Sequence, residues 1–463
     1  MLIVGGVPLL SLGAIVVKWA KGGGGAPLYW CCFYVGASLV YAFTLGMTSM
    51  VGVGGGFGAL IFLDQVGILF VALSALVGLL SLVAMVLGTP GFTSRGLMLC
   101  FLMLMLSLFG VFTVSGGMFF FVCFELCVLP IFLLISKWGA QVDRVFSGYY
   151  FFFYSVITPA PLLLFFLKIT AAGFGSLPCL IYGGEASSLG AVGMAVLLLG
   201  FLTKLPLYGL HIWLPKAHVD APVGGSMVLA GVMLKMGGFG LVRLHQLNVL
   251  HLKQFVGVPE GLIIFLGMAG FFATSLVCLR LVDYKVIVAF SSVGHMSIAA
   301  LGLIVGVGWG FMGGLYVFVG HGIVSPLLFY VGGVLYSRFG SRLVTGWGGV
   351  GSTWGPIFYG AFLLMFMFNF GFPPFLNFFG ELGIFYGVLA FSYGLGLVVF
   401  VGYLFSGIYM LNVVVSMTHG PLPTGPGGSS SYMKSTCSAG EWFLLWALVL
   451  TYVLLGAFVM KLY

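Results

Sequence analysis

Charge is the property that this 463-residue sequence has least of. Asp and Glu together number 9, Lys and Arg together number 17, and charged residues make up 6% of the chain. A soluble domain carries about 25% charged residues, so this composition excludes an ordinary soluble fold. Hydrophobic residues account for 61% of the sequence. They form continuous apolar blocks without the alternation of a membrane β-barrel, which predicts an all-α polytopic membrane protein.

Motifs for cofactors, metals and nucleic acids are also missing from the sequence. The eight cysteines form no C-x-x-C pair and no Cys/His zinc pattern, and most of them fall in apolar runs. No G-x-G-x-x-G lies in a strand–turn–helix context. The basic residues are dispersed and form no cluster that suggests nucleic acid. We therefore expect this chain to bind no cofactor, metal or nucleic acid itself.

Apolar runs long enough to cross a bilayer as helices repeat along the whole chain. At about 20 apolar residues per helix, they predict about fourteen spans in a single integral membrane domain over residues 1–463. The predicted spans cover residues 1–17, 28–49, 58–88, 97–115, 117–135, 147–167, 190–212, 221–243, 257–279, 286–305, 309–334, 354–389, 392–415 and 440–460. The stretch 417–440, rich in Gly, Pro, Ser and Thr, is predicted to be a loop before the last helix, 440–460.

The basic residues are distributed unevenly between the predicted loops. Loops that join an odd-numbered span to the following even-numbered span hold eleven of them, whereas the opposite side holds four. The eleven are Lys18, Lys21, Arg95, Lys137, Arg144, Lys216, Arg280, Lys285, Arg338, Arg342 and Lys434. By the positive-inside rule, the odd-to-even loops face the cytoplasm or matrix, and both termini face the opposite side.

Prolines interrupt two of the predicted spans. Pro206 falls in the seventh span, and Pro373 and Pro374 fall in the twelfth. A proline within a helix removes one hydrogen bond and frees the carbonyl four residues earlier, which here includes the carbonyls of Leu202 and Asn369. In a bilayer these carbonyls must find water or polar partners. The sequence therefore predicts two broken helices, each beside a buried charge.

Four charged residues stand inside stretches that are otherwise apolar enough to span a membrane: Glu125, Lys204, Lys235 and Glu381. A charge at the centre of a membrane helix costs roughly 2.5–3.5 kcal/mol on insertion scales. Such residues usually face the bundle interior, pair with one another and mark ion or proton pathways. A Glu–Lys pair that opens and closes would switch proton release from the lysine. We therefore expect a protein that moves charge through a bilayer.

Histidines and serines near these charges complete a candidate relay. The segment DYKVIVAFSSVGHM places Ser291, Ser292 and His295 in one predicted span, and HGIVSP places His321 and Ser325 one turn apart in the next. Histidine titrates near neutral pH and so can pass protons between other groups. The candidate proton-transfer residues are Glu125, Lys204, Lys235, His295, His321 and Glu381.

Structural interpretations compete with these roles. Glu125 and Lys204 could form a static buried ion pair, and Lys235 could extend toward the membrane surface. His295 and His321 could be packing histidines whose hydrogen bonds are satisfied within the core.

The segment that contains Lys204 is the richest in polar side chains. Lys204, Tyr208 and His211 are spaced four and three residues apart, which predicts one shared helix face. His218 and Asp220 fall in the loop that is predicted to follow. For His211 and His218 a structural or interfacial role is favoured.

Several segments carry a family resemblance. They are KLPLYGLHIWLPKAHVDAPVGGSMVLAGVMLKMGGFG within 201–243, FELCVLPIFLLISKWG, DYKVIVAFSSVGHM, HGIVSPLLFY and FPPFLNFFGEL. With these segments the chain resembles the subunit-4 family of antiporter-like membrane proteins in mitochondrial NADH–ubiquinone oxidoreductase (complex I), which is similar to cation/proton antiporter subunits. The resemblance runs from about residue 117 to 415, and the flanking regions match only in hydropathy.

The resemblance implies a fold and a set of residue roles. The fold has fourteen helices with inverted five-helix repeats, here 97–243 (helices 4–8) and 257–415 (helices 9–13), and a broken helix in each. The implied roles are an ion pair for Glu125 and Lys204, a central proton carrier for Lys235, a lateral relay for His295 and His321, and a proton exit for Glu381. A carboxylate at position 381 distinguishes this family from sister subunits, which carry lysine there.

The resemblance also implies a function and partners. We expect a proton-translocating membrane-arm subunit in the mitochondrial inner membrane, with the odd-to-even loops on the matrix side. Flavin mononucleotide (FMN), iron–sulfur clusters and ubiquinone are expected in other subunits of the complex. Antiporter-like subunits on either side and lipids such as cardiolipin are the expected partners. A stand-alone Na⁺/H⁺ antiporter subunit without redox chemistry is the alternative, and a structural spacer that has lost pumping is a third possibility.

Overall fold

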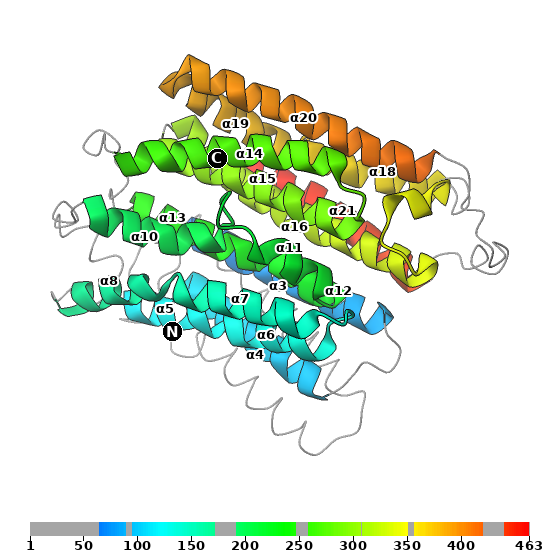
Figure 1. Cartoon of the computed structure of the whole chain (residues 1–463), viewed down its shortest axis with the longest axis horizontal. Coiled ribbons are helices and arrows are strands. Elements are labelled where there is room, and N and C mark those ends of the chain that lie inside the picture. Colours follow the sequence, from blue (N-terminus) through cyan, green and yellow to red (C-terminus); the bar gives the residue numbers. More distant parts are fainter. Residues whose placement is uncertain are drawn as a thin grey trace.

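The computed structural model describes residues 64–88, 95–171, 191–246, 258–306, 308–350, 356–419 and 439–462. The predicted spans 1–17 and 28–49 and most of the predicted loop 417–440 lie outside these ranges. In Figure 1 the described helices run side by side in one bundle, with α4–α8 on one side, α18–α20 on the opposite side and α15 and α16 between them. The described part is helical apart from turns, bends and isolated bridges such as the one between Asp283 and Leu343.

Most helices of the first half follow the predicted spans. They are α3 (Gln65–Gly88), α4 (Arg95–Thr113), α5 (Gly117–Leu126), α6 (Val128–Trp138), α7 (Arg144–Ile157), α8 (Ala160–Ala171), α10 (Ala191–Lys204), α11 (Trp213–Asp220), α12 (Val223–Val228) and α13 (Leu234–Gln246). A π-helical turn, Leu229–Met233, joins α12 to α13.

Helices of the second half do the same. They are α14 (Val258–Arg280), α15 (Tyr284–Val305), α16 (Gly308–Phe339), α18 (Pro356–Phe370), α19 (Leu376–Phe391), α20 (Tyr393–Thr418) and α21 (Ala439–Leu462), with a 3₁₀ turn at Val344–Trp347. In the described ranges, nine helical segments are long and apolar enough to cross a membrane. A multi-pass helical membrane protein is therefore confirmed, and the total of fourteen spans stays a prediction.

Both predicted helix interruptions are confirmed. Helix α10 ends at Lys204 and α11 begins at Trp213, while α18 ends at Phe370 and α19 begins at Leu376. Gly209 and Gly371 have φ values of +94° and +70° in the two connections. Glycine adopts this left-handed backbone conformation readily, so at each break the chain can turn away from the axis of the preceding helix.

Two expectations for the segment after Lys204 are wrong. Tyr208 and His211 share no helix face with Lys204, because the helix ends there and residues 205–212 form turns. Pro206 cannot donate a backbone hydrogen bond, so the helix stops, and Leu207 N instead donates to the carbonyl of Leu202 at 3.2 Å. Tyr208 and His211 stack on each other, with ring centroids 4.9 Å apart.

The predicted loop with His218 and Asp220 is likewise helical, since both residues lie in α11. This half-helix re-enters the bundle and packs against α7 and α15. Consequently His218 has no exposed surface, and the side chain of Asp220 is also buried.

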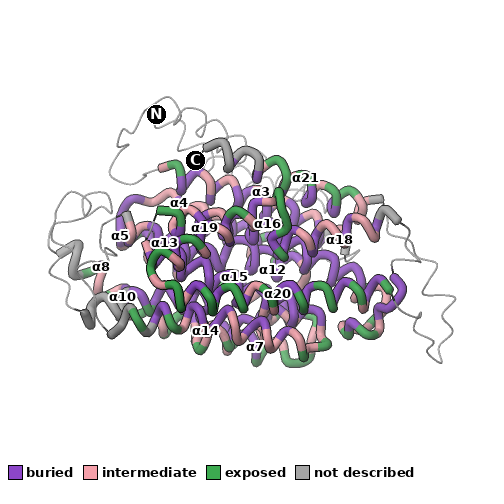
Figure 2. The backbone as a smooth tube through the Cα atoms, turned by 90° about the horizontal axis from the view of Figure 1, so that it is seen from above, coloured by how far each residue is buried: buried purple, intermediate pink, exposed green. Residues whose placement is uncertain are grey.

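Helix α16 lies at the centre of the bundle, and Figure 2 shows buried residues concentrated on it and on α15, while α20 and α14 expose residues at the outside. Helix α16 meets α19 through glycines. A Cβ atom on Gly313 would lie 2.5 Å from the carbonyl oxygen of Gly380 and 2.6 Å from the amide nitrogen of Ile384. A Cβ on Gly387 would lie 2.7 Å from the Cα atom of Gly310. The two backbones are therefore in direct contact, as small residues permit in membrane bundles.

We predict that Gly313→Ala destabilises the protein and Gly360→Ala does not. Overpacking against backbone atoms costs about 1–3 kcal/mol. Gly360 has no atom within 4 Å of the site of an added Cβ, and alanine favours a helix over glycine by about 1 kcal/mol. Thermal unfolding in detergent should show a lower midpoint only for the Gly313 variant. Equal midpoints would contradict a backbone contact between α16 and α19.

Candidate functional site

Lys235 lies at the centre of the buried polar network. Its side chain has no exposed surface, although it sits in the second residue of α13 within the apolar bundle. Its Nζ donates a hydrogen bond of 2.5 Å to the carbonyl oxygen of Ala230 and lies 3.0 Å from Nδ1 of His321. Ala230 belongs to the π-helical turn that precedes α13. A π-turn removes carbonyls from the regular i→i−4 hydrogen-bond pattern of an α-helix. Here the carbonyl of Ala230 faces the amine of Lys235.

His321 links Lys235 to the next helix along the network. It lies in the middle of α16 and is buried. Nδ1 faces Lys235, whereas Nε2 has no hydrogen-bond partner among the described residues. A protonated Lys235 donates to both of its neighbours, which requires an unprotonated Nδ1 on His321 and places that ring's proton on Nε2. The centroid of the His321 ring lies 5.4 Å from that of His295.

His295, on α15, is held by acceptors on both sides. Nδ1 lies 2.8 Å from the carbonyl oxygen of Ser291, and Nε2 lies 3.0 Å from the carbonyl oxygen of Asn369 and 3.4 Å from Oε1 of Glu381. Carbonyl and carboxylate oxygens only accept hydrogen bonds, so both ring nitrogens must carry hydrogen. The geometry thus fits an imidazolium of His295 paired with the carboxylate of Glu381.

The broken twelfth predicted span positions both partners of His295. Asn369 is the penultimate residue of α18, and its carbonyl was expected to be freed by Pro373. Glu381 lies on α19 beyond the break and is 8% exposed. A Cβ on Gly371 would lie 2.7 Å from Oε2 of Glu381, so the carboxylate reaches back to the connection between the two half-helices.

Glu125 and Lys204 lie near each other at the other end of the site without a hydrogen bond between them. Glu125 Oε1 and Lys204 Nζ have no hydrogen-bond partner among the described residues. Lys204 Nζ instead lies 4.6 Å from the ring centroid of Phe124, a cation–π contact. The two charges are close enough to interact electrostatically. The ion pair implied by the family resemblance is therefore open in this structure.

The six candidate residues fall into two groups. Lys235, His321, His295 and Glu381 form one continuous series across α13, α16, α15 and α19. Glu125 and Lys204 form a second group, and α10, which carries Lys204, packs against α13. No signal in the sequence indicates the π-turn or the carbonyl of Ser291 as a partner of His295, whereas the prolines did indicate the free carbonyl of Asn369.

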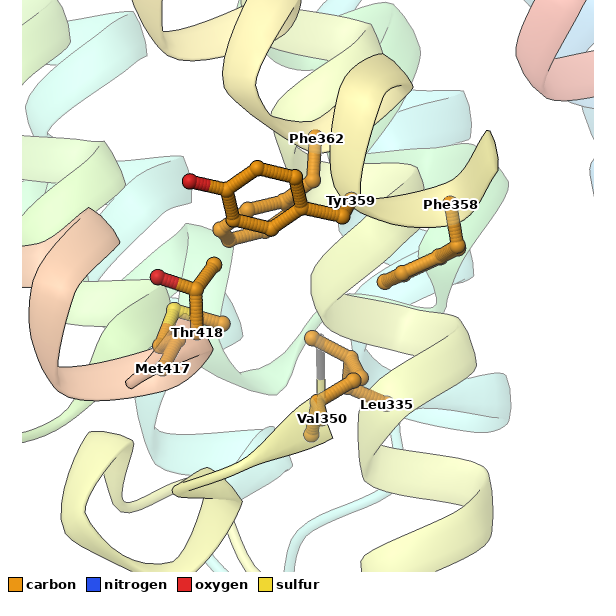
Figure 3. A pocket seen from close by; sticks show the side chains of 7 residues that line it. All are labelled: Leu335, Val350, Phe358, Tyr359, Phe362, Met417 and Thr418. Atoms are coloured by element: carbon orange, nitrogen blue, oxygen red, sulfur yellow. The ribbon is translucent and has the colours of Figure 1, made fainter. Parts of the chain in front are cut away.

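Neither a metal cluster nor the pocket shown in Figure 3 provides an alternative centre among the described residues. They contain no group of three or more His, Cys, Asp or Glu side chains placed to hold a metal ion. A pocket between α16, α18 and α20 has a volume of about 10 Å³ and is shown in Figure 3. It is lined mainly by apolar side chains, with Tyr359 and Thr418 as its polar members. That volume is about the size of one water molecule, so the pocket is too small for a substrate.

A protein-family model matches more than half of the chain. The family described as "NADH:quinone oxidoreductase/Mrp antiporter, TM" matches residues 115–406. "NADH-ubiquinone oxidoreductase chain 4" of Albinaria caerulea is 35% identical over 367 residues, which cover 78% of this chain and 81% of that protein. The protein of the same name from Paracentrotus lividus is 36% identical over 298 residues, covering 64% of this chain and 63% of that one. The chain thus spans less than two thirds of some of its relatives.

Solved structures share the fold. A chain of respiratory complex I from Thermus thermophilus with bound NADH superposes with a TM-score of 0.82 at 25% identity, covering 98% of this chain and 96% of that chain. A chain of the Mrp complex from Dietzia sp. DQ12-45-1b gives a TM-score of 0.83 at 18% identity, covering 98% and 93%. The second likeness is one of fold alone.

We predict that His321 and Lys235 are energetically coupled. His321→Leu removes one of the two acceptors of the Lys235 amine, so it should lower stability by about 1–3 kcal/mol, the usual cost of a buried polar group left unsatisfied. In a Lys235→Met background the same change leaves no amine unpaired and should cost clearly less. A double-mutant cycle by thermal unfolding measures the difference. Equal costs in both backgrounds would mean that the contact contributes nothing.

Proposed function

The chain belongs to the NADH:quinone oxidoreductase/Mrp antiporter family of membrane subunits, and from this premise we propose that it is a proton-translocating membrane-arm subunit of respiratory NADH:ubiquinone oxidoreductase. The observation that carries the proposal is the buried series Lys235–His321–His295–Glu381. Ionisable groups inside an apolar bundle are costly, and a continuous series of them suits proton transfer.

Protons would move along this series one group at a time. Lys235 gives a proton to Nδ1 of His321, which then releases the proton on Nε2 toward His295. The ring centroids are 5.4 Å apart, so this step uses a water molecule or a ring rotation. His295 must first pass the proton held on Nε2 to Oε1 of Glu381, which lies 3.4 Å away, because a ring with hydrogen on both nitrogens cannot accept another proton. A rotation of the His321 ring then turns an unprotonated nitrogen back toward Lys235, so that each group regains its first state before the next proton arrives.

Glu125 and Lys204 would control how readily the groups of this series hold a proton. When the carboxylate meets Lys204, it stabilises the ammonium, and when the pair opens, the lysine tends to release its proton. A charged Lys204 also disfavours a second positive charge on nearby groups, because like charges repel strongly in a medium of low dielectric constant. The open arrangement described above fits one state of such a switch.

The proposed fold contains two related halves, 97–243 and 257–415. The fourth of the five predicted spans in each half is broken, at α10/α11 and at α18/α19. Broken helices at matching positions are typical of transporters built from inverted repeats, with ion sites at the breaks. This placement supports the assignment of both breaks to the proton path.

The expected location, topology, partners and cofactors follow from membership of such a complex. The protein would lie in the mitochondrial inner membrane with its odd-to-even loops in the matrix and both termini on the other side. Antiporter-like subunits would flank it, and anionic lipids such as cardiolipin would fill the contacts. FMN, iron–sulfur clusters and the ubiquinone site would belong to other subunits, so this chain would contribute proton transfer and no redox step.

A stand-alone Na⁺/H⁺ antiporter subunit is the second candidate function, because the description of the matching family includes Mrp antiporters. Native purification separates the two. Co-purifying flavin and iron with rotenone-sensitive NADH:quinone activity supports the proposal. A redox-silent complex that exchanges Na⁺ for H⁺ would replace it with the second candidate.

We predict that Lys235→Met stops proton transfer through this subunit. Methionine preserves the volume but holds no proton, and a positioned acid–base group contributes about 10²–10⁴-fold to transfer rates. The number of protons translocated per NADH oxidised should fall in proteoliposomes. Lys137→Met is the matched control, because Lys137 is exposed at the end of α6. An unchanged proton ratio in Lys235→Met would favour a spacer that no longer pumps.

A further inference from the structure

His218 is a buried titratable group that the proposed series leaves unused. Its side chain has no exposed surface, and neither ring nitrogen has a hydrogen-bond partner among the described residues. Burying a polar group without a partner costs several kcal/mol in an apolar medium, and buried polar groups that lack protein partners are commonly met by water. An imidazole whose two nitrogens both lack protein partners is therefore out of place as a simple packing residue.

Stacking fixes the orientation of this ring. The centroid of His218 lies 4.5 Å from that of Phe329, and the two planes differ by 5°. Phe329 is buried on α16, the helix that carries His321. Because the ring face is occupied by the phenylalanine, the two nitrogens point along the ring edges and remain available to other groups.

Charged groups from three helices lie near His218. Lys235 on α13 and His321 on α16 are close enough to interact with it electrostatically. Lys285 on α15 interacts with it in the same way. Nζ of Lys285 donates a 3.3 Å hydrogen bond to the carbonyl of Val219, the residue after His218. His218 is therefore near both the central lysine and Lys285.

Lys285 belongs to a polar group at the end of the bundle. It lies at the start of α15, beside Asp283, whose Oδ2 is 3.6 Å from Nε of Arg342. The side chains of Asp283 and Arg342 are 25% and 23% exposed, so this group reaches the surface. Asp220, at the end of α11, is near enough to interact with Lys285. The polar residues thus continue from the surface to His218.

We propose that His218 is a proton-transfer residue that joins this end of the bundle, formed by Asp220, Asp283, Lys285 and Arg342, to Lys235 and His321. The inference rests on the proposed function and adds the uptake branch that the series itself does not contain. A proton from bulk water reaches one ring nitrogen through bound water, and the ring releases the proton on its other nitrogen toward Lys235. Lys235 accepts it after passing its own proton to His321, so no group gains or loses charge over a cycle.

The test uses the assembled complex in proteoliposomes with two changes at this position. His218→Gln keeps a polar side chain that cannot relay a proton, and His218→Phe keeps the stack on Phe329. His245→Gln is the matched control, because His245 also stacks on a phenylalanine, Phe311, at a centroid distance of 4.3 Å. The measurements are protons translocated per NADH and the solvent deuterium isotope effect on NADH oxidation, with Lys235→Met in parallel.

We expect both His218 variants to lower the proton ratio to the value of Lys235→Met. The isotope effect of the His218→Gln variant should exceed that of the parent, because proton uptake then limits the rate. A merely structural defect would lower assembly without raising the isotope effect. Normal ratios in both His218 variants together with a low ratio in Lys235→Met would overturn the inference and leave the proposed function intact. A normal ratio in Lys235→Met would instead overturn the proposed function.

A second measurement needs no variant and therefore tests the inference even if the His218 variants fail to assemble. A cryo-electron microscopy map of the parent complex that resolves ordered water should show a water molecule on at least one ring nitrogen of His218, continuing toward Lys285 or Lys235. A well-resolved map with neither nitrogen hydrated would overturn the inference.

Discussion

A charged group enclosed by apolar helices is stable only where another polar group meets it, and the centre of this protein is arranged around that requirement. The acceptors are supplied by irregular backbone. The π-turn presents the carbonyl of Ala230 to Lys235, and the broken helix presents the carbonyl of Asn369 to His295. A regular helix would use both carbonyls internally, so the distortions and the buried charges depend on each other.

Much of the fold could be predicted from the sequence, because the insertion of a segment into lipid depends mainly on the apolar composition of that segment. The described helices fall where the apolar runs are, and the breaks fall at Pro206 and Pro373, where the backbone loses a donor. The same reasoning singled out the candidate residues, since a charge such as Lys235 in an apolar run is rare enough to stand out without knowledge of its neighbours.

Features that depend on tertiary contacts could not be found in this way. Lys235 and His321 are 86 residues apart and meet only because α13 and α16 pack together. No glycine or proline pattern marks the π-turn, and nothing local shows that the half-helix with His218 folds back into the core. Lys204 rests on Phe124 because an aromatic face offers a cation an alternative to a carboxylate, a choice that spacing along the chain cannot reveal.

The glycine contact between α16 and α19 has a mechanical consequence. Helix α16 carries His321 and α19 carries Glu381, and between Gly313 and Gly380 no flexible side chain separates the two backbones. Packed backbones resist sliding and compression far more than side chains that can change rotamer. The two helices are therefore expected to move together at this contact. A displacement of α16 would then also shift α19, and with it the position of Glu381 relative to His295.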